Sequence, residues 1–448
     1  MTADHSRIAP RAFEVDNRLV LSIAVPMMLA YLTTPLIGIT DTVVIGRLGD
    51  AALLGGLAAG AIVFDLVFAT FNFLRTGTTG LVAQAFGRGD APEEQAVFWR
   101  ALMTAVTLGI VLAIAAPLIV LAGARFIAAE PSVTQAMATY VSVRLLSSPF
   151  ALANYAVLGY VLGRGEARLG LGLQLLLNLV NIGLSVWLGL WMGWGIAGVA
   201  WATVGAEAMA ATIGVSVLVL RFRRLPPLPE GALRNIEALK TMFALNRDIM
   251  IRSFVLLGAF ALFARQGAQL GTLTLAANAV LMNFFLLSGY FLDGFAAAAE
   301  QLAGRSVGAR YRPAFAKALR LTAIWGFAVS GAVSLIFLLF GDAFIAFMTT
   351  AEEVRAAAGR FLPWAALTAV SGVLAFQMDG IFMGATWSRD LRNMMLVSFA
   401  AYVAALLLLG PVFGNSGLWA ALHIFLIIRG VSLLAMVPAR TRATFGTV

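Results

Sequence analysis

Residues 19–45 read LVLSIAVPMMLAYLTTPLIGITDTVVI, and this run carries a single charged side chain, Asp41. A helix needs about 20 consecutive, mostly apolar residues to cross the hydrocarbon core of a bilayer. The run is long enough for one crossing, so it predicts a membrane-spanning helix. Pro26 and Pro35 lie inside it, and bending is expected because each proline removes a backbone hydrogen bond.

Similar apolar runs continue along the whole chain of 448 residues. Hydrophobic residues make up 61% and charged residues 12% of the sequence, whereas a soluble protein has about a quarter of its residues charged. The sequence therefore predicts an all-α polytopic membrane protein with twelve transmembrane helices. We expect them near 19–45, 51–86, 97–122, 136–163, 168–191, 195–220, 248–270, 272–303, 314–340, 357–384, 392–413 and 417–438.

A polar, proline-bearing stretch separates the first six of these helices from the last six. It indicates an N-terminal six-helix bundle at 1–225, a cytoplasmic linker at 226–246 and a C-terminal six-helix bundle at 247–448. Two such bundles with the same order of helices form a parallel repeat, and transporters built this way place substrate between their halves.

Matching glycines in the two halves support the repeat. Glycines at 87, 159 and 163 recur 221 residues later, and the glycine at 49 recurs 222 residues later. The run GIAGVAWA from Gly195 matches GNSGLWAA from Gly414, an offset of 219. The common register predicts two pseudo-symmetric bundles.

The distribution of positive charge predicts the orientation. One side of the predicted membrane holds 22 of the 31 Lys and Arg residues, and the other side holds Arg47, Arg125, Arg355 and Arg360. Basic loops face the cytoplasm, so both termini are expected there, in the inner (plasma) membrane of a bacterial cell. The polar segment 1–18 lacks the pattern of a signal peptide, and the first apolar run is expected to remain as a helix.

Several kinds of chemistry are disfavoured by composition. The chain has no cysteine and two histidines, His5 in the polar tail and His423 in an apolar run, so a metal site is not expected. The glycine-rich stretches lack the phosphate-binding pattern GxxxxGK[ST]. The net charge of +9 is assigned to topology and to anionic lipid headgroups, not to nucleic acid. A membrane-embedded enzyme is a distant alternative without a convincing catalytic constellation.

Ionisable residues inside predicted spans are costly to bury and are therefore functional candidates. Asp41 is the foremost, because no other acid or base lies within five residues of it. Asn178 and Asn181 share a helix face, and so do Thr203 and Glu207, because residues three or four apart are neighbours on a helix. These residues are expected to form a polar cluster in the first half, for coupling or merely for hydrogen bonding between helices.

The second half has its own isolated charges, for which a structural salt bridge is the alternative to a functional role. Arg252 is positioned to neutralise Asp293 or Asp379. Candidate residues for a substrate cavity or for gating are Pro26, Asn154, Asn178, Arg252, Asp293, Glu300 and Asp379.

Two blocks in the second half resemble a known family. They are NRDIMIRSFVLLGAFALFARQGAQLGTLTLAANAVLMNFFLLSGYFLDGFAAAAEQLAGRSVGAR at 246–310 and FQMDGIFMGATWSRDLRNMM at 376–395. The first half agrees, with ITDTVVIGRLG at 39–49, GLVAQAFGRGD at 80–90 and NIGLSVWLGLWMGWGIAGVAWATVGAE at 181–207. Over essentially its whole length the chain resembles the DinF-like branch of the multidrug and toxic compound extrusion (MATE) family.

The resemblance implies two six-helix bundles facing each other around a central cavity. It also implies a secondary antiporter that expels organic, often cationic, compounds in exchange for protons or sodium. In this branch the cation site uses an Asp in helix 1, an Asn and an Asp in helix 5 and a Thr in helix 6. Asp41, Asn181 and Thr203 match this pattern, but Ser185 stands where the branch has its second Asp.

That departure leaves one matching carboxylate and predicts proton coupling through Asp41, since burial favours the neutral form of a carboxyl group. Sodium held by Asp41, Asn181 and Thr203 is the alternative, and Glu207 is the residue that would restore the missing charge if it faced the cluster.

We therefore expect an exporter of small amphipathic compounds with no cofactor other than its coupling ion, working as a monomer among membrane lipids. Some of its 16 Met and 31 Phe residues are expected to line the substrate cavity, where such side chains adapt to varied ligands. A flippase for a lipid-linked precursor is the alternative. It would need a basic cavity, for which the candidates are Arg75, Arg252 and Arg265.

Overall fold

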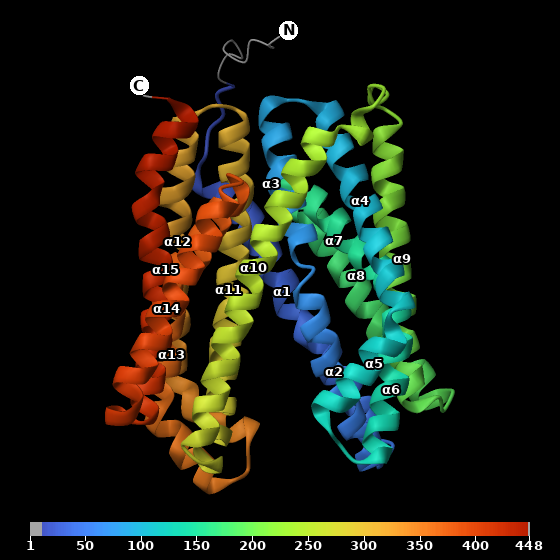
Figure 1. Cartoon of the computed structure of the whole chain (residues 1–448), viewed down its shortest axis with the longest axis vertical. Helices are drawn as coiled ribbons and strands as arrows, with labels where there is room; N and C mark the ends of the chain where they lie inside the picture. The colour runs from blue at the N-terminus through green and yellow to red at the C-terminus, as the bar shows by residue number, and fades with distance from the viewer. Residues whose placement is uncertain (1–10, 447–448) are drawn as a thin grey trace. The chain divides into compact units, whose positions relative to one another are not determined.

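The computed structural model describes residues 11–446, which are almost entirely helical and include no strand (Figure 1). His5 lies outside the described residues. The helices are α1 (Asn17–Gly46), α2 (Ala51–Ala69), α3 (Phe73–Arg88), α4 (Ala91–Ile114), α5 (Ala116–Ile127), α6 (Pro131–Leu146), α7 (Ser148–Gly163), α8 (Ala167–Val186), α9 (Gly195–Phe222), α10 (Ile236–Gln269), α11 (Thr272–Gly308), α12 (Arg312–Met348), α13 (Glu352–Gly384), α14 (Ser388–Phe413) and α15 (Asn415–Phe445), with a π-helical turn η1 (Trp187–Trp191) and a 3-10 turn η2 (Ala232–Arg234).

Side chains just before several helices fix where those helices begin. The Asp50 carboxylate accepts hydrogen bonds from the backbone N–H groups of Ala52 and Leu53, at 2.8 and 3.3 Å, and so caps α2. Asn235 caps α10 in the same way. Such caps satisfy donors that the first turn of a helix leaves unpaired. Because α10 begins at Ile236, the last residues of the predicted linker 226–246 are helical.

The predicted membrane class agrees with the helix lengths. Among the described residues, ten helical segments are long and apolar enough to cross a membrane, and the bent pair α6 and α7 makes eleven. The seventh expected span lies within α10, which is not among these segments. Twelve spans are consistent with the fold, and that number stays a prediction.

Three expected spans are not single helices. The run expected at 51–86 is divided at 70–72 into α2 and α3. The run expected at 97–122 is divided at Ala115 into α4 and α5, and the run expected at 136–163 is divided at Ser147 into α6 and α7. Pro117 and Pro149 lie in the first turn of α5 and of α7. Proline has no backbone N–H and its ring clashes with the preceding turn, so it suits the start of a new helix and not the continuation of the previous one. The break at Ser147 bends the chain by 51° between α6 and α7.

The described chain forms two compact units. The C-terminal unit contains 11–31, Ala83–Gly89 and 247–446, and the N-terminal unit contains Leu32–Val82 and Asp90–Asn246. Helices α1 and α3 each contribute one part to each unit. The boundaries 1–225, 226–246 and 247–448 and the central cavity stay predictions.

The repeat is visible in how helices pack within each unit. Gly163 on α7 lies against α3, where an added Cβ would be 2.8 Å from the carbonyl oxygen of Thr79. Gly384 on α13 lies against α11 at the carbonyl oxygen of Glu300. Both residues of the second pair come 221 positions after those of the first. The same close approach of two backbones is therefore built once in each unit.

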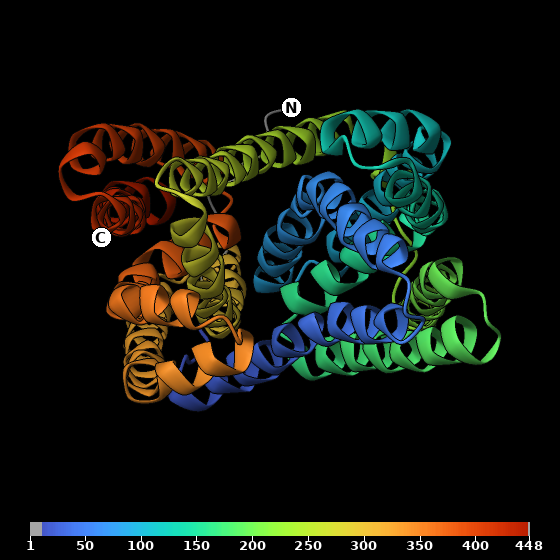
Figure 2. The same ribbon diagram turned by 90° about the horizontal axis from the view of Figure 1, so that it is seen from below.

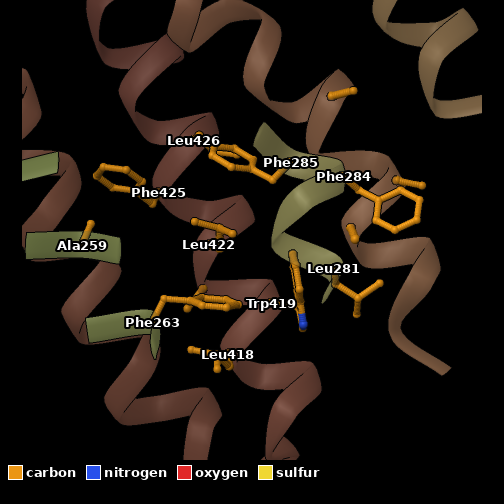
Figure 3. Close-up of a cluster of buried hydrophobic side chains, with 14 of the residues drawn as sticks. Ala259, Phe263, Leu281, Phe284, Phe285, Leu418, Trp419, Leu422, Phe425 and Leu426 are labelled. Atoms are coloured by element: carbon orange, nitrogen blue, oxygen red, sulfur yellow. The ribbon is translucent and has the colours of Figure 1, made fainter. Parts of the chain in front are cut away.

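A large hydrophobic cluster fills the C-terminal unit (Figure 3). Phe263 of α10 meets the Trp419 ring of α15 edge to face, with ring centroids 5.1 Å apart. Leu422, Phe425 and Leu426 continue the buried face of α15 along the same cluster. Arg429 lies about one turn further along α15, where it binds Asp379.

We predict that Gly384→Ala destabilises the protein by about 1–3 kcal/mol, because a Cβ there overlaps the backbone of α11. Gly331→Ala, in the middle of α12, is the matched control. No atom lies within 4 Å of its added Cβ, and alanine favours helix. Thermal unfolding in detergent, followed by tryptophan fluorescence, should separate the two variants. Equal melting temperatures would contradict the packing argument.

Candidate functional site

Helix α8 buries its polar residues and exposes its apolar ones. Asn178, Asn181 and Ser185 are 2%, 0% and 0% exposed, whereas Leu179 is 66% exposed. The spacing of three and four residues places these polar side chains on one face of the helix. A helix whose apolar face is turned outward suits a lipid environment. We call the buried face that carries Asn178, Asn181 and Ser185 the polar strip of α8.

The polar strip of α8 contacts the second half of α1 (Figure 2). The Ser185 hydroxyl donates a hydrogen bond of 2.9 Å to the Asp41 carboxylate. Two turns earlier on α1, Thr33 accepts a hydrogen bond of 2.7 Å from the Asn178 side-chain amide. Asp41 is only 3% exposed. The residue that departs from the family pattern, Ser185, is therefore the direct partner of the leading candidate.

The strip also contacts α9. The Asn181 amide donates a hydrogen bond of 2.7 Å to the Thr203 hydroxyl. The side-chain oxygen of Asn181 is buried without a hydrogen-bond partner. Asp41, Ser185, Asn181 and Thr203 thus form one buried cluster in the N-terminal unit, as expected from the sequence. They present several oxygens of the kind that bind a proton or a hard cation.

Glu207 faces the same interior one turn after Thr203. It is 8% exposed, and one oxygen of its carboxylate is buried without a hydrogen-bond partner. Asn154, expected in a substrate cavity or gate, donates a 3.0 Å hydrogen bond to the Glu207 backbone carbonyl. Asn154 therefore helps to hold α7 against α9 beside the cluster.

Arg144 belongs to this cluster, and the sequence interpretation did not select it. Its side chain, at the end of α6, is 8% exposed, and its guanidinium lies 3.9 Å from the centroid of the Phe64 ring. Glu207, Asp41 and Asp65 all interact with it electrostatically. The sequence did contain a signal for Arg144, because it is an isolated basic residue inside an apolar run. The same signal led to the selection of Arg252.

A cavity of about 540 Å³ in the N-terminal unit reaches the cluster. Its walls are small and apolar side chains of α1 and α2, including Leu54, Leu57 and Ala61, together with Tyr140 of α6. Asp41 is the one carboxylate among its lining residues. The cavity is therefore apolar with a single acidic group at its wall.

The C-terminal unit contains a different charged group. The Asp379 carboxylate binds the Arg252 guanidinium at 2.6 Å and also binds Arg429. All three side chains are at most 8% exposed. The structural salt bridge considered for Asp379 is present, and Arg429 is a second partner that the sequence did not indicate.

The remaining candidates do not join the cluster of the N-terminal unit. Pro26 is half-buried in the part of α1 that belongs to the C-terminal unit. Asp293 is half-buried and Glu300 is buried, both on α11 of that unit. His423 bonds to Ser371 and to a backbone carbonyl, and among the described residues no group of three or more His, Cys, Asp or Glu is placed to hold a metal.

A comparison of the two repeats shows that the buried polar residues of the cluster occur in the N-terminal half only. With the offsets of 221 for α6 and α8 and 219 for α9, five polar positions on these helices have an apolar or aromatic counterpart in the large hydrophobic cluster, part of which Figure 3 shows. The counterparts of Arg144, Asn181, Ser185, Thr203 and Glu207 are Ala365, Tyr402, Leu406, Leu422 and Leu426.

Comparison with known proteins gives a consistent result. The sequence profile of the family described as MatE matches residues 26–187 and 249–409. The DNA damage-inducible protein F of Escherichia coli is 36% identical over 422 residues, which cover 92% of this chain and 90% of that protein. A probable multidrug resistance protein NorM of Deinococcus radiodurans is 29% identical, with 96% of each chain covered.

Solved structures agree on the fold. A MOP superfamily transporter from Pyrococcus furiosus superposes with a TM-score of 0.88 at 16% identity, covering 96% of this chain and 97% of that one. A MATE protein in its straight conformation gives 0.88 at 18% identity, with the same coverage. At such identity the likeness concerns the fold alone. The profile and the relative that is 36% identical show that the chain belongs to the MatE family of membrane transporters.

Proposed function

We propose that this transporter exports amphipathic, often cationic, organic compounds in exchange for protons, with Asp41 as the group that takes the proton. The observation that carries the proposal is the cavity of about 540 Å³ with Asp41 in its wall. Its volume lies in the range of about 300–1,000 Å³ that holds drug-sized ligands. The apolar wall suits a lipophilic body, and the carboxylate suits a positive charge.

Exchange would follow if the proton and the organic cation compete for the negative charge of Asp41. An ionised Asp41 attracts an organic cation in the cavity, and a protonated Asp41 does not. Protonation also changes the hydrogen bond from Ser185, which joins α1 to α8. A change in this bond alters the relative stability of two helix arrangements, and a ligand shifts such an equilibrium only by differential binding.

Ser185 favours a proton over sodium. A dehydrated sodium ion requires several oxygen ligands and compensating negative charge. Asp41, the unpartnered oxygen of Asn181 and Thr203 offer oxygens, but the hydroxyl of Ser185 contributes no charge. A single proton neutralises Asp41 completely. Sodium at Asp41, Asn181 and Thr203 remains the alternative.

Two relatives carry the name of probable multidrug resistance protein NorM at 25% and 29% identity, over at least 92% of each chain. These names support the proposal that this transporter also exports varied compounds. The flippase alternative is less favoured, because its basic candidates are otherwise engaged or exposed. Arg252 is bound to Asp379, Arg75 bonds to Asn72, and Arg265 is exposed on α10.

The basic residues further support a location in a bacterial inner membrane with both termini in the cytoplasm. Nothing in the described chain requires a second subunit for the cluster, whose members all come from one unit. We therefore propose that the transporter works as a monomer.

The central test is transport in proteoliposomes. A pH gradient without sodium should drive export of a fluorescent organic cation. Asp41→Asn should abolish this export while leaving the protein folded, because an amide neither binds a proton nor attracts a cation. A sodium gradient that drives export when a pH gradient does not would refute proton coupling. Ser185→Asp, which restores the second carboxylate, should make export sensitive to sodium.

Asp379 should behave differently from Asp41. Asp379→Asn leaves Arg252 and Arg429 buried without their anion, so it should cost about 3–5 kcal/mol of stability. Asp41→Asn removes no partner of a direct ion pair and should cost much less. Thermal unfolding of both variants in detergent measures the difference. An Asp379→Asn protein as stable as wild type would contradict a structural role for this salt bridge.

The orientation is tested with a protease-cleavable tag at the C-terminus. The tag should resist protease added outside intact spheroplasts and should be cut after lysis. Cleavage in intact spheroplasts would contradict the cytoplasmic assignment. A periplasmic loop carrying the same tag, for example between α1 and α2 near Arg47, serves as the positive control.

A further inference from the structure

We propose that Arg144 determines the ion specificity of the transporter. Its guanidinium acts as a built-in counter-cation for Glu207, so that Glu207 adds no net negative charge to the coupling site and the site takes a proton instead of sodium. This inference rests on the proposed coupling function of Asp41.

Arg144 is buried without a direct partner for its charge. It is 8% exposed and forms no ion pair with a carboxylate of the described chain, and its Nε has no hydrogen-bond partner. The contacts of its charged end are aromatic, with Phe64 at 3.9 Å and Tyr140 at 5.8 Å from the ring centroids. Aromatic faces attract a cation but do not neutralise it. A buried guanidinium of this kind requires negative charge nearby.

The charges that face Arg144 come from three helices. Glu207 on α9, Asp41 on α1 and Asp65 on α2 interact with it, as does the Tyr140 side chain on its own helix. Asp65 is exposed on α2, whereas Asp41 and Glu207 are buried. The buried Glu207 side chain is hydrogen-bonded to Ser147, three residues after Arg144, so its carboxylate lies at the end of α6 that carries Arg144. Arg144 and Glu207 are therefore the natural pair.

This pairing decides the charge of the buried cluster. Ionised Asp41 and Glu207 together carry two negative charges, and Arg144 removes one. The remaining charge is that of Asp41, which one proton neutralises. Without Arg144, the site would carry two negative charges among neutral oxygens from Asn181 and Thr203, and that arrangement suits a metal cation.

The repeat supports a joint role for Arg144 and Glu207. Arg144 lies one turn before the break at Ser147, whose hydroxyl donates a 2.8 Å hydrogen bond to the Arg144 carbonyl. In the other half, α13 continues unbroken through the equivalent positions, with Ala365 in place of Arg144 and Leu426 in place of Glu207. Both charges of the pair are thus confined to the half that contains Asp41.

The test compares wild type, Arg144→Lys, Arg144→Gln and the double variant Arg144→Gln/Glu207→Gln in proteoliposomes. Removing one buried positive charge should raise the affinity for sodium by about tenfold or more. Arg144→Gln should therefore gain export driven by a sodium gradient. Arg144→Lys keeps the charge and should remain insensitive to sodium, and the double variant should lose the sodium response. Arg144→Gln without a sodium response, or a double variant that keeps it, would overturn the proposal.

A second measurement covers variants that no longer transport. Sodium should raise the melting temperature of Arg144→Gln in detergent, with potassium as the control ion, and should not raise that of the double variant. Equal sodium effects on the two variants would overturn the role of Arg144. The proposed function fails separately, when wild type itself is driven by sodium or when Asp41→Asn still exports in response to a pH gradient.

Discussion

The burial of Asp41 is the constraint on which the N-terminal unit depends. A carboxylate that is 3% exposed within a membrane-spanning helix needs either a proton or compensating charge. Its direct partner is the neutral hydroxyl of Ser185, which stabilises the charged form only modestly. The surrounding helices therefore supply further polar groups, and α8 turns its amides inward and its leucines outward.

The two halves share a packing scheme but not a chemistry. Gly163 and Gly384 each bring two backbones into contact at matching positions, which shows that the repeat preserves the close approach of helices. The side chains of the polar cluster are not repeated. Where the N-terminal unit has Asn181 and Thr203, the C-terminal unit has Tyr402 and Leu422 in a hydrophobic cluster. At those positions the first unit buries polar side chains and the second buries apolar or aromatic ones.

The sequence predicted the features that follow from local rules. Apolar runs predicted helices because a membrane span must be apolar along its length, and helical spacing predicted the shared face of Asn178 and Asn181. The breaks at Ala115 and Ser147 were missed, since a run of sufficient length does not reveal a division within it.

The partners of isolated charges were harder to predict. Arg429 and Asp379 are 50 residues apart and Arg252 and Asp379 are 127 apart, so their pairing depends on tertiary packing. The assignment of part of α1 and part of α3 to the C-terminal unit depends on packing in the same way. Asp379 is bound by two guanidinium groups, and the loss of its charge would leave both arginines uncompensated. Asp41 is bound by one hydroxyl and opens onto a cavity, so it can lose its charge without stranding a directly paired cation. Of Asp41 and Asp379, we therefore propose Asp41 as the one whose charge changes during a transport cycle.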